Sequence, residues 1–123
     1  MGAAIAKNAL EKHDQVAIET IKIFLDAYAA EIGNFALKLL PYGGLYIAGG
    51  VAPKLISLIS PCSDSIFEVG NQSRFMSILK HKGRVSPIME LMPIHVVLNQ
   101  NVGLIGTIVY GLRLQQAKNQ AQK

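Results

Sequence analysis

Apolar residues recur at steps of three and four through the first third of the chain, which is the spacing of an amphipathic helix. The main helix is predicted between Asp14, which is placed to cap its first turn, and Leu40, which precedes the helix-breaking Pro41. Its apolar stripe consists of Ile21, Phe24, Leu25, Tyr28, Ile32, Phe35 and Leu39. A shorter helix is predicted over residues 3–12, and Gly33 is expected to let the main helix lie close against a sheet.

Two short apolar runs, Leu45–Ala48 and Ile94–Leu98, are predicted to be strands. The first run lacks alternation, so we expect a strand covered on both faces. Helices are predicted between the runs, from Pro53 to about Ser60 and from Phe75 to Gly83. Parallel strands joined by such a crossover lie side by side, which makes the fold class α/β. Two strands alone leave unpaired edges, so neighbouring strands are expected from outside this sequence.

The rest of the chain divides into a loop, a final helix and a tail. Residues 61–73 are the least periodic, and a partial helix is predicted there around Ile66–Val69. After Asn101 a helix is predicted with one aliphatic face and glycines on the other. That aliphatic face consists of Leu104, Ile105, Ile108, Val109 and Leu112. Residues 115–123 form a polar tail that is expected to fray, and residues 1–123 are predicted to be a single partial domain.

The glycine pair Gly49-Gly50, between the first predicted strand and the helix after it, is the main candidate for a binding site. A turn of this kind places bare backbone N–H groups and a positive helix end at the carboxyl tip of a strand, where an anion such as a phosphate can bind. Glycine also leaves room for a ligand to approach the main chain. The alternative is a tight turn that binds nothing.

Composition narrows the classes of partner and compartment. The chain has 123 residues, of which 50% are hydrophobic and 16% charged, and its net charge is +4. This charge permits an acidic ligand such as a nucleotide and does not require nucleic acid. Cys62 is the one cysteine, so no disulfide forms within the chain, and with three scattered histidines it makes no zinc site.

The uncharged stretch between Glu90 and Arg113 contains Asn99-Gln100-Asn101, which indicates a turn and not a membrane span. No secretory signal is expected at the start.

None of the charged side chains away from the glycine pair is predicted to be catalytic. The carboxylates of the predicted helices, Asp26 among them, have the spacing of solvated helix faces, and the isolated carboxylates are also expected to be solvated. His95 is expected to be a hydrogen-bonded residue within a strand. One basic cluster has two interpretations, a solvated corner or an electrostatic aid to nucleotide approach, and consists of Arg74, Lys80, His81, Lys82 and Arg84. No aromatic residues interleave with these charges, so nucleic-acid binding is not predicted.

Several motifs occur together in one order: Gly33-Asn34-Phe35-Ala36-Leu37, the stretch Gly43–Lys54, Lys82-Gly83-Arg84, and the strand and helix within Pro93–Gly106. In these motifs the chain resembles the C-terminal portion of bacterial-type glucokinases, the ATP-dependent glucose kinases of the actin/hexokinase-like fold. The resemblance implies a fragment of a ribonuclease-H-like ATPase domain. It also implies an enzyme that moves the γ-phosphate of ATP, with Mg²⁺ in the complete enzyme, to the 6-hydroxyl of glucose.

The same resemblance places adenosine contacts on Gly49, Gly50, Val51 and Ala52, and it assigns no catalytic or metal-binding residue to this chain. The family's first phosphate loop, its catalytic Asn-Asp pair and its sugar-gripping Glu-x-Gly-His region have no counterpart here, so the chain alone is expected to be inactive. ATP and glucose are the implied partners of the complete enzyme, a homo-oligomer is permitted, and neither nucleic acid nor a membrane is implied. A cytoplasmic location is expected, with an organelle left open.

A different class of protein explains some of the same features. The long amphipathic helix Asp14–Leu40 and an unpaired strand edge also suit a non-catalytic helical interaction module, or a truncated gene product that pairs with a full-length partner.

Overall fold

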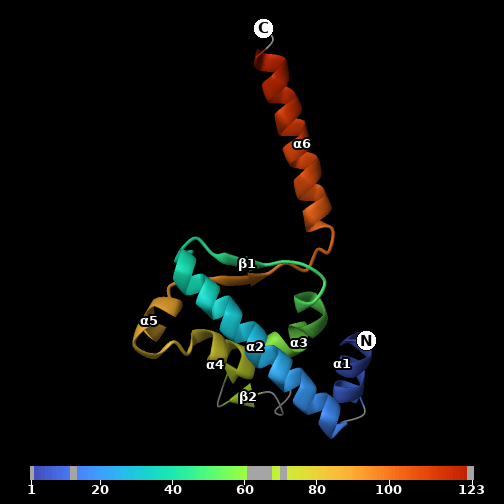
Figure 1. Ribbon diagram of the computed structural model, residues 1–123, viewed down its shortest axis with the longest axis vertical. Helices are drawn as coiled ribbons and strands as arrows, with labels where there is room; N and C mark the ends of the chain where they lie inside the picture. The colour runs from blue at the N-terminus through green and yellow to red at the C-terminus, as the bar shows by residue number, and fades with distance from the viewer. Residues whose placement is uncertain (1, 12–13, 61–67, 70–71, 122–123) are drawn as a thin grey trace.

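The computed structural model describes residues 2–11, 14–60, 68–69 and 72–121. In chain order the elements are α1 (Gly2–Glu11), α2 (Gln15–Leu39), β1 (Leu45–Ile47), a 3-10 helix (Ala52–Leu55), α3 (Ile56–Ile59), β2 (Glu68–Val69), β3 (Gln72–Ser73), α4 (Arg74–Lys80), a second 3-10 helix (Gly83–Val85), α5 (Ser86–Met89), β4 (Ile94–Val96) and α6 (Val102–Ala121). The helix-rich α/β class predicted from the sequence is therefore observed (Figure 1).

Helix α2 begins and ends where its sequence predicts. The Asp14 carboxylate accepts hydrogen bonds from the N–H groups of Val16 and Ala17, at 2.9 and 3.2 Å, and so satisfies two free donors of the first turn. At the other end Leu40 adopts a left-handed conformation with φ of 48°, and its N–H donates to the carbonyl of Ala36. Pro41 follows directly and cannot continue the helix.

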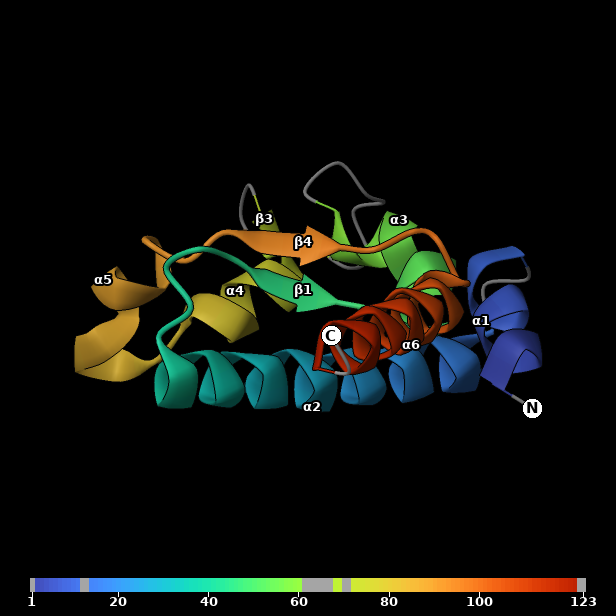
Figure 2. The same ribbon diagram turned by 90° about the horizontal axis from the view of Figure 1, so that it is seen from above.

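The predicted parallel strand pair is confirmed. Strand β1 pairs with β4 in parallel, with Tyr46 opposite His95 in the register. The side chains of Leu45 and Ile47 face the helical layer that contains α2, which lies along one side of the sheet (Figure 2). The Tyr46 and His95 rings stack on each other with centroids 4.8 Å apart, and both residues are exposed. The expectation that β1 is covered on both faces is therefore wrong for the described residues, because none of their elements covers this second face.

The prediction for the irregular segment is also corrected. Glu68–Val69 pair antiparallel with Gln72–Ser73, so these residues form a small hairpin and not the predicted partial helix. The other half of that prediction, residues 66–67, lies outside the described residues, as does Cys62.

The hydrophobic core lies where α2 packs against α4, with contributions from α1, α3, β1 and α5. Its largest completely buried side chains are Phe75, Leu25, Leu58, Leu79 and Met89. Gly33 lies at the close approach of α2 to the end of α4, not against the sheet as expected: a Cβ there would overlap the Leu79 carbonyl and the Lys82 side chain.

Helix α6 projects away from this body (Figure 1). Every residue from Val102 to Gln120 is exposed, and the helix includes residues 115–121 of the polar tail. Just before it, the side-chain Oδ1 of Asn99 accepts a hydrogen bond from the N–H of Asn101 at 2.9 Å. Among the helices of the described ranges, none combines the length and apolar content needed to span a membrane.

Candidate functional site

The glycine pair forms an open turn between β1 and the following 3-10 helix. Gly49 has φ of +114°, a conformation that other residues rarely adopt, so the backbone path requires glycine at this position. A Cβ added at Gly49 or at Gly50 would meet no heavy atom within 4 Å. The outer side of the turn is therefore free for a ligand to approach the main chain, as the sequence predicts.

The backbone donors of this turn are available. The N–H groups of Gly49, Gly50 and Val51 donate no hydrogen bond to a backbone carbonyl of the described residues. The helical contribution to anion binding is smaller than predicted, because the expected helix is split into a four-residue 3-10 helix and the four-residue α3. Any anion here would therefore be bound mainly by individual N–H groups.

The four predicted contact residues differ in exposure. Gly49, Gly50 and Val51 lie on the surface, whereas the side chain of Ala52 is buried in the core at 1% exposure. Ala52 can therefore meet a ligand only through its backbone, while its methyl group fixes the turn to the body of the fold.

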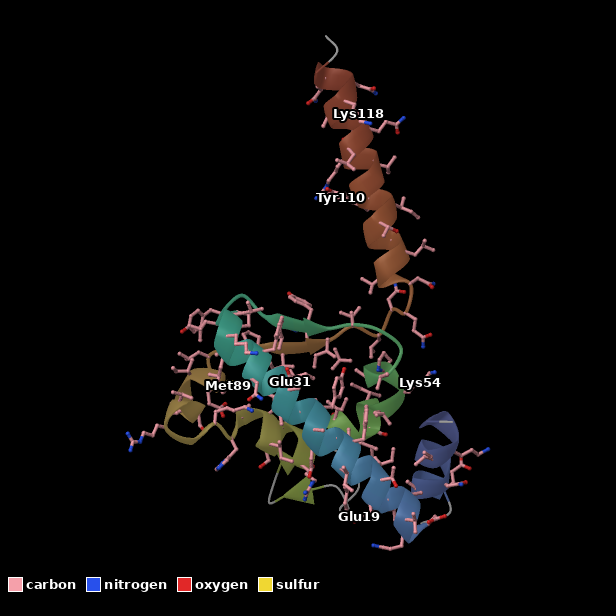
Figure 3. All side chains as sticks on the ribbon, viewed as in Figure 1. Glu19, Glu31, Lys54, Met89, Tyr110 and Lys118 are labelled. Atoms are coloured by element: carbon pink, nitrogen blue, oxygen red, sulfur yellow. The ribbon has the colours of Figure 1, made fainter. Side chains whose placement is uncertain are left out.

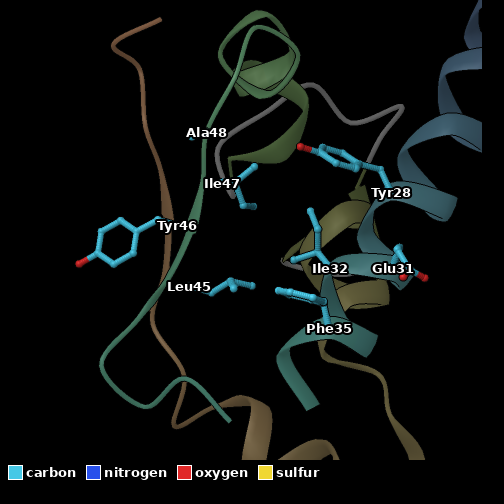
Figure 4. Close-up of a pocket in the computed structure, with 8 residues that line it drawn as sticks. All are labelled: Tyr28, Glu31, Ile32, Phe35, Leu45, Tyr46, Ile47 and Ala48. Atoms are coloured by element: carbon cyan, nitrogen blue, oxygen red, sulfur yellow. The ribbon is translucent and has the colours of Figure 1, made fainter. Parts of the chain in front are cut away.

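An apolar groove of about 330 Å³ lies beside this turn, between α2 and β1 (Figure 4). Its lining consists of Tyr28, Glu31, Ile32, Phe35, Leu45, Tyr46, Ile47 and Ala48. Leu45 and Ile47 point toward the α2 side chains, whereas the Tyr46 ring points away from them (Figure 4). The groove ends at Ala48, directly before Gly49. The sequence does not reveal this groove, because its two walls come from segments separated by the α2–β1 turn. The apolar stripe of α2 nevertheless contains three of the lining residues, Tyr28, Ile32 and Phe35.

Tyr28 lines this groove, and partial burial raises the pKa of its phenol above the ordinary value of 10.0. A raised pKa in the folded state means that the contribution of neutral Tyr28 to stability is present below pH 10 and is lost as the pH rises through the folded-state pKa. We predict that the absorbance titration of the folded chain contains a late tyrosinate step that is missing from the Tyr28→Phe variant. The titration of the unfolded chain in denaturant is the reference, and a late step retained in the variant would contradict the assignment.

The basic cluster predicted from the sequence is largely occupied by structural contacts. The Arg74 guanidinium donates two hydrogen bonds of 2.6 Å to the Asp26 carboxylate, and Lys80 forms a 2.6 Å ion pair with Glu90. The hydrogen bonds to Asp26 raise the pKa of Arg74. The prediction of a purely solvated Asp26 is therefore wrong, because this carboxylate joins α2 to α4. Lys82 is similarly engaged with α2.

Lys82 crosses α2 beside Gly33. Its Nζ donates to the Ala30 carbonyl at 3.0 Å and to the Asn34 Oδ1 at 2.8 Å. Of the predicted cluster, His81 and Arg84 remain as exposed side chains with no hydrogen bond or ion pair to a described residue. Arg74, Lys80 and Lys82 thus make structural contacts, which leaves only His81 and Arg84 of this cluster for electrostatic guidance of a nucleotide.

The Arg74–Asp26 pair provides a stability prediction. In a double-mutant cycle with Arg74→Met and Asp26→Asn, we expect a coupling free energy of about 1 kcal/mol, because the pair is bidentate but each side chain remains about one-third exposed. The control is the Lys7–Glu11 pair, whose side chains are 66% and 63% exposed and whose coupling should be about 0.3 kcal/mol. Urea unfolding measures both, and equal couplings would contradict the prediction.

The described residues hold no group of three His, Cys, Asp or Glu side chains that could bind a metal ion. No step that requires Mg²⁺ is assigned to these residues. What the site can do is present backbone donors to an anion next to an apolar groove.

Comparison with known proteins gives a consistent result. The family model described as Glucokinase matches residues 1–114. The chain is similar to the glucokinase of Trichormus variabilis, with 48% identity over 113 residues that cover 92% of this chain and 30% of the relative. For the glucokinase of a Synechocystis species the identity is 47% over 109 residues, covering 89% of this chain and 28% of the relative.

More distant relatives show the same coverage. The glucokinase of Photorhabdus laumondii is 27% identical over 106 residues, covering 86% of this chain and 30% of the relative. The chain thus spans about 30% of the length of the curated relatives it matches. No solved structure matches the chain.

Proposed function

The chain belongs to the glucokinase family, and we propose that it forms the C-terminal, adenosine-contacting portion of a glucokinase with the ribonuclease-H-like fold of the actin/hexokinase ATPases. The complete enzyme transfers the γ-phosphate of ATP to the 6-hydroxyl of glucose. The single cysteine agrees with a reducing compartment, and the cytoplasm is the proposed location.

The open turn at Gly49 and Gly50 carries this proposal. It follows β1 at the carboxyl end of a parallel strand pair, the edge at which α/β folds bind ligands. The N–H groups of Gly49, Gly50 and Val51, which donate to no backbone carbonyl of the described residues, supply donors for a phosphate or ribose oxygen. The two glycines let that ligand come close to the main chain. In phosphoryl transfer such groups act by fixing the nucleotide in position.

The proposal gives this chain no part in the chemical step. A base for the sugar hydroxyl and ligands for Mg²⁺ are needed for transfer, and neither is assigned to the described residues. We therefore predict that the purified chain shows no turnover in a coupled assay for glucose 6-phosphate. Formation of glucose 6-phosphate above an enzyme-free blank would contradict this prediction.

Nucleotide binding is tested by comparing the ATP affinities of glycine-to-valine variants at the two ends of β1. Gly50→Val is expected to weaken ATP binding by at least tenfold, because its side chain fills the space where the ligand approaches the main chain. Gly50 is a suitable position because its φ is not in the left-handed region and an added Cβ meets no neighbour, so the fold should not change. Isothermal titration calorimetry with ATP measures the affinity, and the thermal unfolding midpoint verifies folding.

Gly43→Val is the matched control. Gly43 lies at the amino end of the same strand, its φ is not left-handed, and an added Cβ there also meets no atom within 4 Å. Its ATP affinity should equal that of the unmodified chain. If both variants bind ATP equally well, or the unmodified chain shows no ATP-dependent rise in its unfolding temperature, the assignment of the turn to adenosine is wrong.

A further inference from the structure

Lys54 lies one helical turn beyond the glycine pair, on the same side of the chain as Val51. The two residues are three positions apart at the 3-10 helix that begins with Ala52, and the Lys54 N–H donates to the Val51 carbonyl at 3.1 Å. Since a 3-10 helix has three residues per turn, side chains three positions apart lie above one another. The Lys54 side chain therefore extends from the side of this helix on which Val51 borders the open turn.

The hydrophobic core fixes this orientation of the 3-10 helix. Ala52 and Leu55, which are also three positions apart, are 1% and 6% exposed and belong to the core. Val51 and Lys54 are both exposed. A rotation of the helix that buried Lys54 would bring Ala52 and Leu55 into water, so the lysine is held on the outside. Figure 3 shows Lys54 on the outer side of the connection between β1 and α3.

The Lys54 ammonium group is the only charged side chain on the two segments that follow the parallel strands. Residues 48–60 continue from β1 and residues 97–112 continue from β4, and together they contain no other Asp, Glu, Lys or Arg. Because β1 and β4 are parallel, both segments leave the sheet at the same edge. Lys54 forms no ion pair with a carboxylate of the described residues. An anion at this edge therefore meets one positive charge and no acidic residue from either segment.

The open turn needs such a charge if it is to bind a polyphosphate. Its N–H groups carry only partial charges, and a 3-10 helix of four residues adds little to them. Hydrogen bonds from an ionised donor to a phosphate are about twice as strong as neutral ones. Lysine supplies such a donor on a flexible stem, which lets the ammonium group follow the phosphate oxygens.

We propose that Lys54 binds the phosphate chain of the nucleotide and so makes the site select phosphorylated nucleotides over the nucleoside alone. This inference rests on the proposed nucleotide site at Gly49 and Gly50 and deepens it. The ammonium group donates hydrogen bonds to phosphate oxygens, while the N–H groups of the turn hold the part of the nucleotide that lies against the main chain.

The test compares ATP with adenosine, which lacks the phosphates, by isothermal titration calorimetry on the whole chain. Lys54→Met removes the charge and keeps a stem of similar length. We expect it to weaken ATP binding about tenfold and to leave the affinity for adenosine unchanged. Lys54→Arg retains the charge and should keep most of the ATP affinity. Added salt should reduce the difference between Lys54→Met and the unmodified chain.

Lys38→Met is the matched control. Lys38 is an exposed lysine in the last turn of α2, before the amino end of β1, and it also forms no ion pair with a described carboxylate. Its replacement changes the net charge equally and should not alter ATP affinity. Equal weakening by both methionine variants would overturn the proposal, because net charge would then be the cause. Weakening of ATP and adenosine alike by Lys54→Met would also overturn it, because the lysine would then support the turn and not bind phosphate.

Gly50→Val, titrated beside these variants, distinguishes failure of this inference from failure of the nucleotide site. If Gly50→Val loses ATP binding and Lys54→Met retains it, the site stands and the role of Lys54 is wrong. If the unmodified chain binds no ATP, both are wrong. Because Lys38 and Lys54 are exposed, their variants should unfold at the same temperature as the unmodified chain in the absence of ligand.

Discussion

A Phe75→Ala variant is expected to lose about 3–5 kcal/mol of its free energy of unfolding, enough to leave much of the chain unfolded at 37 °C. Phe75 is completely buried at the centre of the α2–α4 contact. Its ring lies 5.8 Å from that of Tyr28, centroid to centroid, in a tilted aromatic pair. Alanine would remove this pair and leave a cavity that α2 and α4, both held by other contacts, cannot close.

Phe75→Leu is the appropriate control because it preserves most of the buried volume and should cost less than about 1.5 kcal/mol. Urea unfolding followed by far-UV circular dichroism measures both variants. Equal losses for alanine and leucine would show that the aromatic contact, not the filled volume, supplies the stability. A loss below about 1 kcal/mol for alanine would mean that Phe75 is not at the centre of the core.

The elements that the sequence predicts well are those fixed by local chemistry. Helix α2 is an example, because a capping carboxylate at Asp14, a continuous apolar stripe and a terminating Pro41 all lie within its own segment. The open turn at Gly49 is another example, since glycine is the residue type that readily adopts the positive φ found there. The parallel pairing of β1 and β4 follows from the crossover between them.

Features that depend on long-range contacts could not be predicted in the same way. The Arg74–Asp26 pair joins residues 48 positions apart, and nothing near either residue indicates the other. Spacing places Asp26 on the polar side of α2, which is correct, but only the position of α4 turns this carboxylate into a structural partner. The groove between α2 and β1 could not be predicted for the same reason, although it lies directly beside the candidate site.

The uncovered surfaces have a different cause. The apolar composition of β1 and of α6 predicts burial, yet Tyr46 is 64% exposed and α6 lies in solvent. The apolar pattern of a sequence reflects the burial of each residue in the complete fold. This chain spans only about 30% of the length of its relatives. The apolar composition of β1 and α6 is therefore not matched by burial among the described residues.

Gly33→Ala is expected to destabilise the chain, which is the opposite of what this substitution usually does within a helix. Within a helix, alanine in place of glycine normally stabilises by about 1 kcal/mol. At Gly33 we expect a net loss of about 2–3 kcal/mol and a fall of roughly 10 °C in the unfolding midpoint. The added Cβ would overlap the carbonyl oxygen of Leu79, which is backbone and can move only if α4 separates from α2.

The new Cβ would also meet the Lys82 side chain, whose Nζ would lie 2.9 Å away. Replacing Lys82 by alanine distinguishes the two possible causes of the lost stability. If crowding of a flexible side chain were the cause, Gly33→Ala in a Lys82→Ala background would be harmless. If the Leu79 carbonyl is the cause, as we expect, the penalty persists in that background. Gly106→Ala is the matched control, since this residue is also in a helix but its Cβ would meet nothing within 4 Å. Gly106→Ala should leave the unfolding midpoint unchanged or raise it slightly. The same substitution would then have opposite effects in two helices, because only Gly33 lies against a neighbouring backbone.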